Sequence, residues 1–192
     1  PIVLSLSPGK THFQYAQDCL ENANMWRIMD DLWDTWTGVD MVFREAAEWA
    51  KYSRPGNYAD CDMLPLGQIA ATVGDPGVCN NDNGRWTNLT KDEQYTMMTL
   101  WGIFRSPLMM GGEMRENDEF TLSLLQNREL IDMLKNSSGA RQFKREETDG
   151  KGEIIWTSTG ENCKYVALFN TDDKEREIRF NITDISIGGV KY

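Results

Sequence analysis

The stretch that decides the fold is Asn24–Trp36, with the sequence NMWRIMDDLWDTW. It places Arg27 and three carboxylates within eight residues, and three tryptophans stand among them. Residues 25–29 are mostly apolar, which is typical of a buried strand whose charged residues emerge at its C-terminal end. In a parallel α/β barrel that end of the strands carries the active site. The stretch therefore predicts a carboxylate site beside an aromatic wall large enough for a carbohydrate.

Arg27 and Asp31 carry the most specific hypothesis in this stretch. An acid that protonates a leaving group is a carboxyl held by polar neighbours, and the planar arginine fork can hold one. The alternative is a structural ion pair at the end of a strand, because ion-pair networks also gather acids around an arginine. The stretch alone leaves both interpretations open.

Charge and composition narrow the class of partner. The 192 residues carry a formal net charge of −10, which disfavours nucleic acid and anionic membrane surfaces and favours a neutral substrate. The hydrophobic content of 40 % is enough for a packed core, but no apolar run approaches the roughly 20 residues of a membrane span. Residues 1–6 form a strand-like run without an initiator Met, so we expect a fragment, and no compartment follows from the sequence.

The sequence predicts no metal and no cofactor. Its four cysteines contain no C-x-x-C pair, and the single His12 cannot complete a zinc site. We expect cysteines that are unpaired or form at most one disulfide: Cys19, Cys61, Cys79 and Cys163. Residues 80–84 have the composition of a calcium loop, but they lack the spacing and the downstream glutamate of an EF-hand, so a turn is favoured.

Strands and helices are predicted to alternate before residue 140. The predicted strands are residues 1–6, 25–29, 60–67 and 106–112, and the predicted helices are residues 11–24, 39–52, 91–104, 120–127 and 128–134. The helix at residue 91 begins after Thr90, which forms a capping box with Glu93. A long loop is expected over residues 74–84. After residue 139 the pattern changes to short strands at 154–156, 165–169 and 178–180.

Four separated motifs give the chain a family resemblance. They are Trp26-Arg27 with the paired aspartates, Pro55-Gly56 followed by Asp60-x-Asp62-Met63-Leu64, a helix with Leu100-Trp101, and Ser106-Pro107-Leu108 ahead of a β-rich segment. In this order they resemble the melibiase-type α-galactosidases, glycoside hydrolase family 27, over nearly the whole chain. The resemblance implies an α/β fold in which residues 1–140 are the second half of a (β/α)8 TIM barrel, strands five to eight. Residues 141–192 would be the first strands of an antiparallel β-sandwich domain, truncated before it closes.

The resemblance also implies roles for individual residues. Asp31, four positions after Arg27, would be the general acid/base. Arg27 would grip the 2-hydroxyl of the sugar and orient the acid. Asp62 and Met63 would lie under the sugar, with Asp60 as the acid that supports Asp62.

Two further substrate contacts are expected. Trp26 belongs to the predicted aromatic wall, and Ser7 falls in the loop after strand five, where the family reads the 2-substituent of the sugar. Ser7 is not the acidic residue that marks strict galactose readers, so the sequence leaves the exact sugar open.

The predicted site lacks a nucleophile. Retaining glycosidases need two carboxyls about 5 to 5.5 Å apart, and the resemblance implies that the second one stands on strand four, ahead of residue 1. Asp30 would point away from Asp31 because side chains alternate along a strand, and Asp34 lies beyond the strand.

The leading hypothesis is a retaining glycoside hydrolase whose acid/base half is in this chain, so that the isolated chain is inactive. Its partners would be terminal α-galactosides or related sugars, with no nucleic acid and no membrane, and the exposed barrel edges would favour self-association. The alternative is a catalytically silent carbohydrate-binding or scaffold fragment. A metal-dependent hydrolase is disfavoured because the chain lacks histidine ligands.

Overall fold

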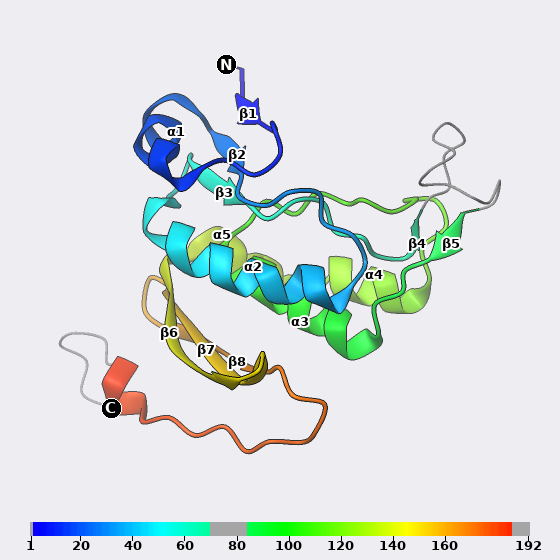
Figure 1. Cartoon of the computed structure of the whole chain (residues 1–192), viewed down its shortest axis with the longest axis vertical. Coiled ribbons are helices and arrows are strands. Elements are labelled where there is room, and N and C mark those ends of the chain that lie inside the picture. The colour runs from blue at the N-terminus through cyan, green and yellow to red at the C-terminus, as the bar shows by residue number, and fades with distance from the viewer. Residues whose placement is uncertain (1, 70–83, 186–192) are drawn as a thin grey trace.

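The first part of the protein is a parallel strand–helix unit. The computed structural model describes residues 2–69 and 84–185 (Figure 1). Its first three strands form one parallel sheet in the order β1-β2-β3, and helices return the chain between neighbours, so the predicted alternation is confirmed here. The elements of this unit are β1 (Ser5–Leu6), η1 (Phe13–Tyr15), α1 (Ala16–Asn22), β2 (Met25–Arg27), α2 (Trp36–Trp49), η2 (Ala50–Tyr52) and β3 (Tyr58–Asp60).

The third strand lies earlier than predicted. We expected it over residues 60–67 with acids at its entry, but β3 ends at Asp60, so the acids stand at its C-terminal end. After Asp60 the backbone amides donate to side chains and not to a neighbouring strand. The Cys61 amide donates to Ser106 Oγ and the Asp62 amide to Asp60 Oδ1, each at 2.9 Å. Asp62 also has a left-handed φ of 81°, which ends regular strand geometry.

Short strands and three helices follow the parallel unit. They are β4 (Gln68–Ile69), β5 (Arg85–Trp86), α3 (Lys91–Phe104), α4 (Glu119–Leu125) and α5 (Arg128–Asn136). β4 and β5 pair antiparallel, and most of the expected loop, with Cys79, lies outside the described residues. The capping box before α3 is confirmed: the Thr90 amide donates to Glu93 Oε2 at 2.7 Å and the Glu93 amide to Thr90 Oγ1 at 3.2 Å.

The predicted strand over residues 106–112 is wrong. Among the described residues its place is taken by extended chain with one parallel bridge, between Leu64 and Met110. Pro107 has no amide to donate to a strand ladder. A Cβ added at Gly112 would lie 2.1 Å from the Leu66 carbonyl oxygen, so the chain runs closer to its neighbour than side chains permit.

An antiparallel sheet follows α5. It consists of β6 (Ser138–Thr148), β7 (Lys151–Thr159) and β8 (Lys164–Asn170), in that order, and a short helix, η3 (Ile182–Ile185), comes after it. β7 and β8 contain two of the predicted strand segments, whereas residues 178–180 form no strand and β6 was not predicted. β6 begins ahead of the expected domain boundary after residue 140.

One hydrophobic core joins the two parts. Helices α2 and α3 lie between the parallel strands and the antiparallel sheet (Figure 1). Phe43 of α2 meets Phe169 of β8 with ring centroids 4.9 Å apart, and Phe104 of α3 meets Trp156 of β7 at 5.9 Å, both edge to face. The buried aromatic rings thus fix the sheet against the two helices.

Residues 2–69 and 84–185 contain neither a membrane-spanning helix nor a metal-binding cluster. No helix there is long and apolar enough to cross a membrane. No group of three or more His, Cys, Asp or Glu side chains in these ranges is placed to hold a metal ion. Cys19, Cys61 and Cys163 are free thiols.

Candidate active site

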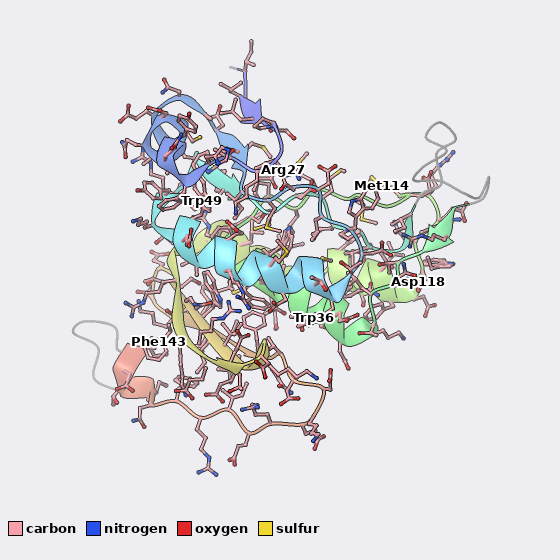
Figure 2. All side chains as sticks on the ribbon, in the orientation of Figure 1. Arg27, Trp36, Trp49, Met114, Asp118 and Phe143 are labelled. Carbon is pink, nitrogen blue, oxygen red and sulfur yellow. The ribbon has the colours of Figure 1, made fainter. Side chains whose placement is uncertain are left out.

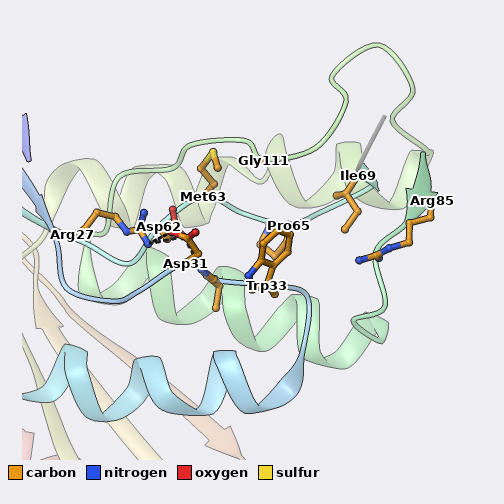
Figure 3. A pocket seen from close by; sticks show the side chains of 10 residues that line it. Arg27, Asp31, Trp33, Asp62, Met63, Pro65, Ile69, Arg85 and Gly111 are labelled. Carbon is orange, nitrogen blue, oxygen red and sulfur yellow. Dashed lines mark hydrogen bonds and ion pairs between the residues drawn. The ribbon is translucent and has the colours of Figure 1, made fainter. Parts of the chain in front are cut away.

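A cavity of about 270 Å³ opens beyond the C-terminal ends of β2 and β3 (Figure 3). Its lining residues are Arg27, Asp31, Leu32, Trp33, Asp62, Met63, Pro65, Ile69, Arg85 and Gly111. Parallel strands place their C-terminal ends at one edge of a sheet, and this is why residues about 30 positions apart in sequence meet here. We call this space the Arg27 cavity.

Arg27 holds two carboxylates with one nitrogen atom. Its Nη2 lies 2.9 Å from Asp62 Oδ2 and 3.3 Å from Asp31 Oδ1. The surroundings of the two acids differ sharply: the Asp62 side chain is 7 % exposed, while that of Asp31 is 76 % exposed. Asp62 Oδ2 also accepts the Leu32 amide at 2.7 Å, so this oxygen is committed to the protein. Asp31 is therefore the carboxyl that is free to meet a ligand.

The backbone of Asp62 is held in a conformation that non-glycine residues rarely adopt. A left-handed φ costs free energy and persists only where the surroundings fix it. Here the Asp62 amide donates to Asp60, its carbonyl accepts Trp101 Nε1 at 3.2 Å, and its carboxylate takes the bonds from Leu32 and Arg27. These contacts hold the Asp62 backbone in this conformation, with its carboxylate paired to the arginine.

Asp60 acts on the cavity indirectly. It is buried, stands opposite Arg27 in the sheet register, and does not line the cavity. Burial raises the pKa of its carboxyl; the hydrogen bond from the Asp62 amide opposes this, and the Asp62 carboxylate adds to it. Asp60 thus supports the Asp62 backbone, as expected, but it does not itself line the cavity as a substrate contact would.

The prediction that Trp26 binds substrate is wrong. Its side chain is fully buried and packs on Trp49 with ring centroids 6.0 Å apart. Successive side chains of a strand point to opposite faces, so Trp26 faces the helices while its neighbour Arg27 faces the cavity. Trp36 and Trp49 mark the ends of α2 (Figure 2), and Trp36 packs against the core. Of the three tryptophans expected to form the aromatic wall, Trp33 is the one that lines the cavity, and it is 48 % exposed.

Of the remaining predicted substrate contacts, one lines the cavity and one does not. Met63 is 52 % exposed and lines the Arg27 cavity as expected. Ser7 lies in a different hollow, beside Pro8 and Tyr15, and is not brought to the cavity. Asp30 accepts the Lys10 amide at 2.9 Å and does not line the cavity, in line with its expected orientation.

Sequence reasoning missed an ion pair at the far end of the cavity. Arg85 of β5 binds Asp34 through two nitrogens, Nη1 at 2.6 Å from Oδ2 and Nη2 at 2.9 Å from Oδ1. Asp34 is 3 % exposed and also accepts the Asn88 amide at 2.6 Å. Burial by itself would raise the pKa of Asp34, but the hydrogen bonds from Arg85 and Asn88 outweigh it and lower the pKa. The two partners are 51 positions apart, and no periodic pattern links them.

Arg85→Gln is expected to lower the unfolding free energy by about 1–3 kcal/mol at pH 7, because it leaves the buried Asp34 carboxylate without its cation. The pKa of Asp34 is lowered in the folded protein, so the stabilisation is fully present above about pH 4 and is lost as the pH falls through the folded pKa. The difference in unfolding free energy between Arg85→Gln and the wild-type protein should therefore be smaller near pH 3 than at pH 7, as measured by urea unfolding.

The matched control for this prediction is Arg179→Gln. Arg179 pairs with Glu177 at the surface, where the two side chains are 80 % and 71 % exposed, so its replacement should leave stability unchanged. If Arg85→Gln lowered stability equally at both pH values, its effect would come from packing and not from the charge of Asp34.

Known proteins are similar to this chain in sequence and in fold. The family described as alpha galactosidase A (Melibiase_2) matches residues 6–136. Alpha-galactosidase 2 of Arabidopsis thaliana is 30 % identical over 164 residues, which cover 85 % of this chain and 37 % of that protein. The solved structure of a family 27 β-L-arabinopyranosidase from Geobacillus stearothermophilus is 45 % identical with a TM-score of 0.85. The match covers 96 % of this chain and 41 % of the chain of that enzyme.

A second solved structure is a variant of that Geobacillus enzyme in complex with arabinose. It is 48 % identical with a TM-score of 0.78, and the match covers 88 % of this chain and 38 % of that one. The chain thus spans about two fifths of the length of these relatives. The family match covers well over half of the chain and includes Arg27, Asp31 and Asp62. The chain therefore belongs to the alpha-galactosidase A, or melibiase, family of glycoside hydrolases.

Proposed function

We propose that this chain supplies the acid/base half of the active site of a retaining glycoside hydrolase. One observation carries the proposal: a single arginine nitrogen holds a buried carboxylate and an exposed one. The buried Asp62 fixes the guanidinium, and the exposed Asp31 is left to exchange a proton with a substrate. General acid/base groups combine such a fixed orientation with access to the reacting atoms.

Asp31 serves in both steps of the proposed reaction. As an acid it protonates the glycosidic oxygen while the bond to the leaving group breaks. As a base it then takes a proton from the water that releases the sugar. Arg27 keeps the carboxyl in place through both steps and offers donors to a sugar hydroxyl, and Met63 forms an apolar surface of the cavity.

The second carboxyl of this reaction is not Asp62. The two carboxylate oxygens contact the same Arg27 nitrogen at 3.3 and 2.9 Å, so they lie closer together than the roughly 6.5–9.5 Å of inverting enzymes. We infer that Asp62 is not the nucleophile of a retaining enzyme either, because its side chain is only 7 % exposed and its Oδ2 already accepts Arg27 and Leu32. We propose that the nucleophile stands on a barrel strand other than β1, β2 and β3.

We further propose the domain plan expected from the sequence, a half barrel of strands five to eight over residues 1–140 and the start of a β-sandwich over residues 141–192. Three parallel strands, with the cavity at the C-terminal ends of β2 and β3, support the first part. The antiparallel sheet β6-β7-β8 supports the second.

The proposed substrates are terminal α-galactosides and β-L-arabinopyranosides. Relatives of this chain are named for each of these two activities. The two sugars share the arrangement of their ring hydroxyls and differ in the hydroxymethyl group, which only the hexose has. An acid and an arginine that meet the ring and the glycosidic oxygen therefore suit both.

The test is to assay the natural full-length protein on an aryl α-galactoside and an aryl β-L-arabinopyranoside, and to follow the first-formed anomer by NMR. We expect hydrolysis of at least one with retention of configuration. Inversion would contradict the proposal. Sugar binding without turnover would favour the silent carbohydrate-binding module instead.

The isolated 192-residue chain is expected to show no turnover, because neither carboxyl of the described cavity can act as the nucleophile. Mass spectrometry after exposure to a mechanism-based inactivator should show no covalent adduct. An adduct would place the nucleophile within these residues.

We propose that the isolated chain also self-associates. Ile2 and Val3 beside β1 are 95 % and 70 % exposed, and within the described ranges β1 pairs with β2 alone. A monomer in sedimentation at high concentration would contradict this.

A further inference from the structure

Two buried residues at the end of α3 hold the backbone around Asp62 from outside the Arg27 cavity. Trp101 Nε1 donates to the Asp62 carbonyl at 3.2 Å, and Ser106 Oγ accepts the amide of the preceding residue, Cys61, at 2.9 Å. Both side chains are fully buried, and neither lines the cavity. Each belongs to one of the four motifs of the family resemblance, and the proposed reaction so far gives neither of them a role.

Trp101 and Ser106 form one structural unit where α3 ends. The Trp101 carbonyl accepts the amides of Arg105 and Ser106, at 2.9 and 3.0 Å. Arg105 ends the helix with a left-handed φ of 70°, and its Nε donates to the Leu134 carbonyl of α5 at 2.8 Å. The unit is therefore fixed to two helices before it contacts the segment that follows β3.

The segment that follows β3 receives hydrogen bonds from this unit and from the chain after it. Cys61 bonds to Ser106, the Asp62 carbonyl to Trp101, and the Leu64 amide to the carbonyl of residue 109 at 2.8 Å. Asp62 has the left-handed φ of 81°. The cost of such a φ and the gain from one hydrogen bond are of similar size, so loss of the Trp101 bond is sufficient to let the Asp62 backbone relax.

A relaxed Asp62 would affect the acid through Arg27. Asp62 Oδ2 lies 2.9 Å from Arg27 Nη2, and the same nitrogen lies 3.3 Å from Asp31 Oδ1 (Figure 3). The Asp31 side chain is 76 % exposed, so its orientation depends on this guanidinium. If Asp62 turned away, the guanidinium would shift and carry the Asp31 carboxyl out of line with the glycosidic oxygen. Small displacements of a reacting group reduce the rate steeply.

We propose that Trp101 and Ser106 are positioning residues for the acid. They fix the backbone of Asp62, which in turn fixes the guanidinium of Arg27. Arg27 then orients the carboxyl of Asp31, so the two buried residues control proton transfer without touching the substrate. This inference rests on the proposed function, because it takes Asp31 as the acid.

The test compares two leaving groups in the natural full-length protein. A galactosyl disaccharide needs a proton on its leaving group, and a dinitrophenyl α-galactoside does not. For Trp101→Phe, which removes the N–H donor and keeps an aromatic ring, we expect the ratio of kcat/KM for the disaccharide to kcat/KM for the dinitrophenyl galactoside to fall about tenfold. A smaller folded fraction would lower both kcat/KM values equally, so the ratio distinguishes positioning from stability.

Ser106→Ala is the second variant. It removes one oxygen atom and leaves the Cys61 amide without its acceptor, so the same ratio should fall. Because this change is small, it decides the test if Trp101→Phe does not fold.

Trp156→Phe is the matched control. Trp156 is also fully buried, but its Nε1 has no hydrogen-bond partner within residues 2–69 and 84–185, and it does not line the cavity. The replacement removes the same atoms from the core as Trp101→Phe does. It should lower the unfolding free energy and leave the ratio unchanged.

A double-mutant cycle tests the route through Asp62. In an Asp62→Ala background, Trp101→Phe should lower the ratio no further, because the carboxylate that Trp101 positions is gone. If the losses of the two single variants multiplied, Trp101 would act on the reaction independently of Asp62, which would contradict the proposal.

The outcomes separate the positioning role from the function on which it rests. If the wild-type protein hydrolyses both substrates and neither Trp101→Phe nor Ser106→Ala changes the ratio, the positioning role is overturned and the function stands. If the wild-type protein hydrolyses neither these substrates nor the arabinopyranosyl counterparts, the proposed function fails and the inference fails with it.

Discussion

Asp31→Asn is expected to lower kcat/KM for a galactosyl disaccharide by about 10³-fold in the natural full-length protein. The amide keeps the shape of the side chain and cannot donate the proton that a sugar leaving group requires. A dinitrophenyl glycoside leaves without that proton, so its first step should be nearly spared.

Leaving-group dependence and chemical rescue both measure this effect. Azide should restore turnover of the dinitrophenyl glycoside, because it attacks the glycosyl-enzyme without help from a base, and the product should be a glycosyl azide of retained configuration. Asp30→Asn is the control: Asp30 adjoins Asp31 but bonds to the Lys10 amide away from the cavity. If Asp31→Asn lowered kcat/KM equally for the disaccharide and for the dinitrophenyl glycoside, Asp31 would be excluded as the acid.

Arg27→Lys is expected to abolish most activity and to lower the unfolding free energy by about 2–4 kcal/mol. Arg27 is 6 % exposed, and its Nη2 meets Asp31 and Asp62 together. An ammonium on a flexible stem cannot reproduce the planar fork, so Asp62 would keep its burial and lose its partner.

The unfolding free energy, measured with urea, and kcat/KM should both fall in this variant. Arg179→Lys provides the control, because its partner Glu177 is exposed and neither residue lines the cavity. Wild-type turnover in Arg27→Lys would mean that Arg27 contributes charge alone.

The sequence predicted the centre of the site better than its edges. Arg27 and Asp31 lie on one short strand and its exit, and Asp62 follows the neighbouring parallel strand, so local periodicity and strand-end geometry bring them together. The prediction of an aromatic wall was correct in part. The number of tryptophans near an arginine does not indicate which of them points toward the cavity and which toward the core. Trp26 took the core face and Trp33 the cavity.

Features that depend on long-range contacts were beyond sequence reasoning. The Asp34–Arg85 pair joins the exit of β2 to β5, and no local pattern records that meeting. Strand β6 was missed because its sequence, SGARQFKREET, is mostly polar. Several of those polar groups are satisfied across the sheet: Lys144, for example, bonds to Glu153 of β7 at 2.5 Å.

The shared core between the helices and the antiparallel sheet limits how this protein can be cut. Phe43 and Phe104 stand on helices α2 and α3, which pack behind the parallel strands, and their partners Phe169 and Trp156 come from the antiparallel sheet. If the polypeptide ended near residue 140, these rings would be exposed to solvent, and the helices would present an apolar surface that favours aggregation. Proteolysis or gene shortening at that point would then yield aggregates, and the sheet would have to be inherited together with the strands that carry Arg27 and Asp62.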